Sequence, residues 1–129
     1  MLKAKEVFSG ISVDDVDTAK DFYTTVLGLT IDSADMGLHF KLPNGGTLFI
    51  YGKSGHTPAT FTVLNFVVDD IDEAVDELTQ SGVHFEHYTD MPMQPDDKGV
   101  LRGLSAGKGP DIAWFKDPAG NIISILQDK

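Results

Sequence analysis

One short segment occurs twice in this chain of 129 residues. Residues 13–21 read VDDVDTAKD, and residues 68–76 read VDDIDEAVD, 55 positions later. Each copy follows a β-rich alternating stretch and leads to a glycine, Gly28 in the first copy and Gly82 in the second. An offset near half of the chain length indicates two copies of one supersecondary unit that share a core. The repeat therefore predicts two similar modules, at about residues 5–52 and 60–128, within a single domain 1–129.

The composition agrees with one globular domain. Hydrophobic residues make up 41% of the chain and charged residues 23%, as in ordinary soluble domains. No apolar run is long enough to span a bilayer, so we expect no membrane association. The chain has no cysteine, which excludes disulfides, thiolate metal ligands and a cysteine nucleophile. These features favour a cytoplasmic location.

The net charge limits the possible partners. Ten basic residues stand against twenty acidic ones, which gives a net charge of −10. Such a protein repels phosphate backbones, so binding of DNA or RNA is not expected.

Hydrophobic periodicity gives the same order of elements in both halves. In the first half it predicts strands at 7–13, 29–33, 38–42 and 47–51, and a helix that begins at Asp14 or Asp15 and ends at Gly28. In the second half it predicts a helix at 71–79 and strands at 61–68, 83–87, 112–115 and 122–126. The stretch 89–110 has two interpretations, a mobile cover or a surface loop without order. The predicted fold class is α+β, with two βαβββ modules.

Three motifs resemble one family. The segment 11–16 (ISVDDV), the segment 66–71 (FVVDDI) and the closing segment 114–121 (WFKDPAGN) occur in the order and spacing of the vicinal oxygen chelate superfamily. This superfamily includes glyoxalase I, extradiol dioxygenases, and fosfomycin and bleomycin resistance proteins. The resemblance implies that the two modules form a cupped mixed sheet, with a site on its concave face. It also implies a homodimer, because many relatives complete one cavity with sheets from two chains.

The resemblance further implies four metal-ligand positions, which metal-dependent relatives fill with His, Gln or Glu. In this chain they are occupied by Phe8, Phe49, Val63 and Ser124. Divalent metals at such sites require imidazole nitrogen or carboxylate oxygen. We therefore predict no metal and no other cofactor, which argues against glyoxalase-type, dioxygenase and thiol-addition chemistry.

Strand alternation places the same positions independently, because neighbouring side chains point to opposite faces. If Ile11 and Val13 pack under the helix, Phe8 faces the cup. Leu48 and Ile50 in the core put Phe49 and Tyr51 in the cup. By the same rule Val63 and Asn65 face the cup in the second half.

The remaining polar candidates each have two interpretations. His39 and His84 are either ordinary surface histidines or ligand contacts that act as donor or general base. Asn65 and Ser124 each either form hydrogen bonds within the protein or contact a ligand. No acidic residue stands beside a histidine in the order of a hydrolytic triad.

The aromatic residues support a binding function. Aromatic side chains often pack in the core, which is the alternative interpretation. Strand alternation instead favours lining of a cavity by Phe8, Phe49 and Tyr51. Trp114 belongs to the same set, although the register of its strand is not fixed by the sequence. The predicted function is metal-independent binding of a small apolar or aromatic molecule at Phe8, Phe49, Tyr51, Val63, Asn65, Trp114 and Ser124. The alternative is a metal-free lyase or isomerase that uses His39, His84 or Asn65. A metal-dependent glyoxalase-type lyase or dioxygenase is the least favoured of the three functions.

Overall fold

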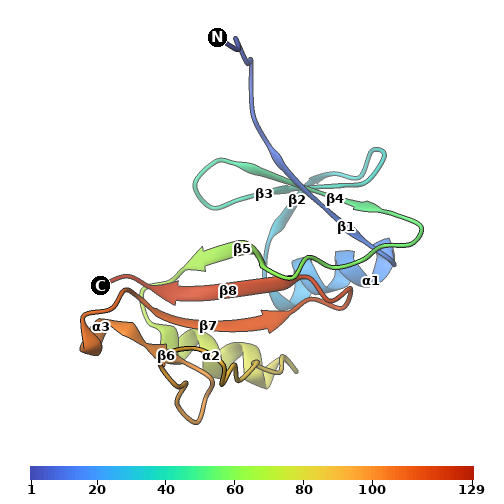
Figure 1. Ribbon diagram of the computed structural model, residues 1–129. Helices are drawn as coiled ribbons and strands as arrows, with labels where there is room; N and C mark the ends of the chain where they lie inside the picture. Colours follow the sequence, from blue (N-terminus) through green and yellow to red (C-terminus); the bar gives the residue numbers. More distant parts are fainter. The chain divides into compact units, whose positions relative to one another are not determined.

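The computed structural model describes all 129 residues and divides into two compact units, Met1–Pro58 and Ala59–Lys129. Each unit has its own four-stranded sheet (Figure 1). The boundary falls within the segment that the sequence predicts as the connection between modules. No helix combines the length and the apolar character that crossing a membrane requires.

The first unit contains a mixed sheet in the order β1-β4-β3-β2. β1 (Ser9–Val13) runs parallel to β4 (Thr47–Gly52), whereas β3 (Leu38–Lys41) and β2 (Thr30–Ser33) pair antiparallel. Alternation along β4 is strict: Leu48 and Ile50 are fully buried, while Phe49 remains partly exposed. One face of the sheet is thus core, and the other face is available for a ligand.

The helical segment of the first unit begins at α1 (Val16–Asp21) and continues as the π-helical turn η1 (Phe22–Val26). Asp15 caps it by accepting a hydrogen bond from the Thr18 backbone N–H at 3.1 Å, which decides between the two predicted caps. Gly28 follows with φ +72°, a left-handed conformation that glycine adopts without steric cost. The predicted helix and its stop are confirmed.

The second unit repeats this design with the strand order β5-β8-β7-β6. Its strands are β5 (Thr62–Val67), β8 (Ile122–Gln127), β7 (Asp111–Lys116) and β6 (Leu101–Arg102). Helix α2 (Ile71–Gln80) contacts β7 and β8 and covers one face of the sheet (Figure 1). Asp70 caps α2 as Asp15 caps α1, through a 3.1 Å bond from the Glu73 backbone N–H. A short helix, α3 (Gly103–Ala106), follows β6.

The prediction of a strand at 83–87 is wrong. Phe85 forms only an isolated bridge with Phe115, and the Glu86 N–H donates to the Trp114 carbonyl at 2.8 Å. Further along β7, Leu101 and Arg102 pair with Ile112 and Asp111 instead. The segments 85–86 and 101–102 therefore share one edge of β7. Because this edge has a limited number of backbone hydrogen-bonding groups, residues 83–87 do not form a full strand on it. The first unit therefore shows the full βαβββ order, whereas in the second unit the corresponding strand is reduced to a bridge.

Part of the irregular stretch 89–110 is held firmly against α2. Asp96 accepts hydrogen bonds from the Lys98 and Val100 backbone N–H groups, both at 2.9 Å. The Arg102 guanidinium then contacts Asp96 at 2.9 Å and Asp72 of α2 at 2.7 Å. The interpretation of this stretch as a loop without order is therefore wrong for residues 96–102. Arg102 is satisfied by carboxylates of the protein itself.

Candidate functional site

The first sheet has an open face, which we define by Gly10, Ser12, His39, Phe49 and Tyr51. Backbone register brings these residues together, because Phe49 pairs with Gly10 on one side and with His39 on the other. Ser12 pairs with Tyr51 in the same way. Val13, Leu48 and Ile50 point to the opposite, buried face. The predicted alternation of β1 and β4 is confirmed.

Phe49 lies at the centre of an aromatic cluster on this face. Its ring stacks on Tyr51 with centroids 5.6 Å apart and an interplanar angle of 19°. The His39 imidazole lies 4.7 Å away, and Phe8 meets Phe49 edge-on at 6.4 Å. These separations are typical of favourable aromatic pairs.

Two glycines make room for the Phe49 ring. A Cβ on Gly10 would lie in contact with both Phe49 and Tyr51, at 3.9 and 4.0 Å. A Cβ on Gly37 would lie 2.6 Å from Phe49 Cε1, closer than atoms can approach, and Gly37 has φ +144°. The observed position of the Phe49 ring therefore requires glycine at position 37.

The cluster borders a cavity of about 580 Å³, which we call the aromatic cavity. That volume lies in the usual range for small-molecule sites. The predicted residues Phe8, Phe49, Tyr51 and His39 all line it, together with Asp35, Met36 and Gly52. Sequence reasoning missed Asp35 and Met36, which precede β3. The feature that positions them is the turn before Gly37. In this turn Met36 has φ 56°, and the Asp35 carbonyl oxygen lies 3.1 Å from His39 Nε2.

In the second sheet, Asn65, Trp114 and Ser124 lie in direct register on one face, where Ser124 is fully buried. The buried Ser124 hydroxyl donates to Asn65 Oδ1, and Trp114 Nε1 donates to Thr62 Oγ1 at 3.1 Å. The two predicted polar residues therefore satisfy one another. Val63 lies at a β-bulge between Thr62 and Leu64, so strand alternation does not assign its direction.

Tyr88 packs edge-on against Trp114, with ring centroids 5.5 Å apart. Its hydroxyl is buried and has no hydrogen-bond partner. Burial raises the pKa of Tyr88 above its usual value, and the nearby Glu86 carboxylate acts in the same direction. The hydroxyl therefore stays protonated and offers an unused donor.

The four positions implied as metal ligands do not suit a metal. Phe8 and Phe49 present hydrocarbon rings to each other, and Val63 has no donor atom. Ser124, the only oxygen among them, donates its proton to Asn65. Nowhere do three His, Cys, Asp or Glu side chains gather in a way that could hold a metal ion. The donor set does not fit a divalent cation.

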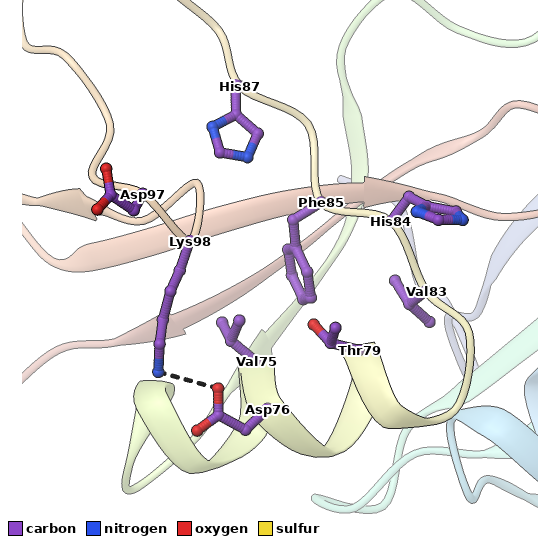
Figure 2. A pocket seen from close by; sticks show the side chains of 9 residues that line it. All are labelled: Val75, Asp76, Thr79, Val83, His84, Phe85, His87, Asp97 and Lys98. Carbon is purple, nitrogen blue, oxygen red and sulfur yellow. Dashed lines mark ion pairs between the residues drawn. The ribbon is translucent and has the colours of Figure 1, made fainter.

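A second hollow of about 360 Å³ lies beside α2 in the second unit (Figure 2). Val75, Val83 and Phe85 contribute apolar side chains, and Lys98 contacts Asp76 at 2.9 Å. His84 and His87 also line it, but their imidazoles do not converge (Figure 2). The placement of His84 in the cup by strand alternation is wrong, because residues 83–87 form no strand and His84 lies on the helix side.

Ser12 and His56 form a pair that sequence reasoning did not find. Ser12 Oγ lies 2.7 Å from His56 Nδ1, although 44 positions separate them. Strand alternation places Ser12 on the open face, but His56 belongs to the segment after β4. No spacing rule indicates that this segment returns to β1.

Comparison with known proteins agrees with this fold. The family model of the Glyoxalase/Bleomycin resistance protein/Dioxygenase superfamily matches residues 7–125. No curated protein sequence matches the chain.

Solved structures resemble the whole chain. TnmS3, an antibiotic binding protein from Streptomyces sp. CB03234, is 21% identical with a TM-score of 0.70, and the match covers 100% of both chains. A superfamily member from Sphaerobacter thermophilus DSM 20745 is 25% identical with a TM-score of 0.67, and the match covers 98% of this chain and 100% of that one. The fosfomycin resistance protein FosX from Listeria monocytogenes is 14% identical with a TM-score of 0.69, covering 99% and 96%. These structures agree in fold, and because the family model matches residues 7–125, the chain belongs to the Glyoxalase/Bleomycin resistance protein/Dioxygenase superfamily.

Proposed function

We propose that this protein binds a small apolar or aromatic organic molecule in the aromatic cavity, and that it does so without a metal. The observation that carries the proposal is the Phe49 cluster, in which aromatic side chains surround a cavity of about 580 Å³. At Phe8 and Phe49, where chelating relatives supply ligands, the surface is hydrocarbon. Such a surface favours an organic guest over a hydrated cation.

The expected affinity is modest. An aromatic group that buries roughly 200 Å² gains about 5 kcal/mol from the hydrophobic effect. Part of this gain is lost to the entropy of association. A simple aromatic probe should therefore bind with a dissociation constant of about 0.2 mM or weaker, and a larger ligand should bind more tightly.

The relatives are compatible with this proposal. TnmS3 is an antibiotic binding protein, and its fold covers the whole of this chain. At 21% identity this likeness concerns the fold, so the ligand class of our chain rests on its own side chains. The homodimer and the cytoplasmic location stay predictions.

A fluorescence titration tests the binding site. N-phenyl-1-naphthylamine is neutral and brightens in apolar surroundings, so it reports occupation of the cavity. We expect Phe49→Ala to weaken its binding at least tenfold, because this ring forms the centre of the cluster. Phe61→Ala is the matched control: Phe61 is 67% exposed, belongs to the second unit and does not line the cavity. Equal affinity for wild type and Phe49→Ala would contradict the proposal.

One observation favours catalysis as a second function. His39 is partly buried and lines the aromatic cavity, where an imidazole could serve as general base in a lyase or isomerase. His84 and Asn65 lack this support, because His84 lies beside α2 and Asn65 is bonded to Ser124. Metal-dependent lyase or dioxygenase activity has no support from the donor set.

A further inference from the structure

We propose that Ser12 and His56 form a nucleophile–base pair that gives the first open face an ester-cleaving activity in addition to binding. Ser12 Oγ lies 2.7 Å from His56 Nδ1, the distance at which an imidazole can take a hydroxyl proton. A serine hydroxyl is a weak nucleophile alone, and an adjacent general base activates it. The pair satisfies this requirement without a metal.

The chain holds both partners in fixed positions. Ser12 belongs to β1 and is partly buried. His56 follows β4 in a turn closed by a 3.1 Å bond from its N–H to the Lys53 carbonyl. The Lys53 N–H in turn donates to the Val13 carbonyl at 3.0 Å, which ties this turn to β1 next to Ser12. The alignment of hydroxyl and imidazole therefore comes from the backbone, which is what an activated nucleophile needs.

The neighbourhood of Ser12 indicates the substrate class. Ser12 and Tyr51 are register partners on the parallel strands β1 and β4, and neighbouring strands lie about 4.8 Å apart. Tyr51 stacks on Phe49 and lines the aromatic cavity. A ligand whose aromatic group lies against Tyr51 would bring an ester carbonyl near Ser12 Oγ. The favoured substrate is an aryl ester with a good leaving group.

The reaction needs only the ester and water. With the other imidazole proton on Nε2, Nδ1 accepts the Ser12 proton while Oγ forms a bond to the carbonyl carbon. The bond from that carbon to the aryl oxygen then breaks with its electron pair on that oxygen. The His56 imidazolium gives its proton to this oxygen, so that a phenol leaves and His56 is neutral again. A water molecule next attacks the acyl-serine and gives one proton to His56. The Ser12–acyl bond breaks, Ser12 takes that proton back from His56, and the acid product leaves as a carboxylate after it loses its proton to solvent.

Covalent labelling tests the nucleophile directly. A fluorophosphonate forms a phosphorus–oxygen bond with an activated serine and releases fluoride, so mass spectrometry can locate the adduct. We expect label at Ser12 in the wild type and at least a tenfold slower reaction in His56→Gln. Ser9→Ala is the matched control, since Ser9 lies on the same strand but at the opposite alternation, and it should label like the wild type. Absence of label at Ser12, or an unchanged rate in His56→Gln, would overturn the proposal.

A second measurement uses the absence of cysteine in the chain. Ser12→Cys introduces a single thiol beside His56, and Ser9→Cys introduces one without that neighbour. We expect iodoacetamide to alkylate the thiol at position 12 at least ten times faster than the thiol at position 9. Equal rates would contradict activation by His56. Binding of N-phenyl-1-naphthylamine to the wild type is measured in parallel. Wild-type protein that binds the dye but is not labelled at Ser12 contradicts this proposal and leaves the proposed binding function standing.

Discussion

Phe49 connects separate parts of the first unit through its ring. It contacts His39 from β3, Tyr51 from its own strand and Phe8 from the residues before β1. Strand alternation predicts from sequence that Phe49 faces away from Leu48 and Ile50. The neighbouring residues Asp35 and Met36 could not be predicted in this way, because a turn without alternation positions them.

Substitution of Gly37 tests how firmly the Phe49 ring is held. An alanine Cβ there would overlap Phe49 Cε1 at 2.6 Å, whereas Gly45, also at positive φ, has nothing within 4 Å of the same atom. Both Gly→Ala changes carry backbone strain, so their difference reports the contacts around Gly37, namely those with the Phe49 ring and with the Ile50 carbonyl oxygen, 2.9 Å from the new Cβ. Overpacking of this kind costs about 1–3 kcal/mol. We expect Gly37→Ala to lower the free energy of unfolding by that much more than Gly45→Ala in urea denaturation. Equal losses would contradict tight packing around Gly37.

Histidines show where residue-level prediction fails. His39 belongs to strand β3, so strand alternation predicts the direction of its side chain. His84 lies in a segment that makes only one bridge to β7, so strand alternation does not determine the direction of its side chain. The Ser12–His56 pair depends on a turn that returns to β1, which no local pattern encodes.

At the scale of elements, the repeated Val-Asp-Asp motif marks a helix start in each unit. Its second aspartate is the N-cap in both copies, Asp15 for α1 and Asp70 for α2. An N-cap side chain satisfies a backbone N–H that the helix leaves unpaired. The sequence predicts both helices for this reason.

Alanine substitution separates the two aspartates of the second motif. Asp70→Ala removes the bond to the Glu73 N–H and should cost about 1 kcal/mol of unfolding free energy. Asp69→Ala, one residue earlier, removes no cap and should change stability by less than about 0.5 kcal/mol. Thermal or urea unfolding measures both. Similar losses in the two variants would contradict the assignment of the cap.

The link between α2 and residues 96–102 was not predictable from sequence. It depends on Arg102, which contacts Asp72, Asp96 and Asp111 from three different segments. Sequence spacing gives no indication that these carboxylates converge. The same link brings β6 to the edge of β7.

Acid titration tests this ion-pair network. Hydrogen bonding from Arg102 lowers the pKa of Asp72 below its usual value. For Asp96, burial opposes the shift, but hydrogen bonds from the Val100 N–H and Arg102 outweigh it and lower its pKa. Because the folded values lie below the unfolded value of about 3.9, these groups stabilise the fold above pH 4. That contribution is lost as the pH falls through the folded values.

We therefore expect the unfolding free energy of the wild type to fall more steeply between pH 5 and pH 2 than that of Arg102→Met. At pH 7 the substitution should cost about 1 kcal/mol, since solvent screens these partly exposed charges. Lys116→Met is the control. It removes a single pair with Glu86, 3.3 Å away, and should cost less than about 0.5 kcal/mol. Parallel pH profiles for wild type and Arg102→Met would contradict this account of the network.

At the scale of the whole molecule, the internal repeat predicts two modules, and the structure has two units with matching strand orders. Each unit buries an apolar face of its sheet. The opposite faces differ in chemistry: the first carries an aromatic cluster, and the second carries a hydrogen-bonded Asn65–Ser124 pair. This difference favours the first unit as the ligand site.

Dependence of binding on metal is the most direct test of the central claim. The dissociation constant for N-phenyl-1-naphthylamine is measured on protein treated with a chelator, and again after addition of nickel, zinc, iron or manganese. The hydrocarbon lining at Phe8 and Phe49 predicts the same constant, within twofold, under all conditions. Binding that disappears with the chelator and returns with one of these metals would contradict metal-independent recognition in the aromatic cavity.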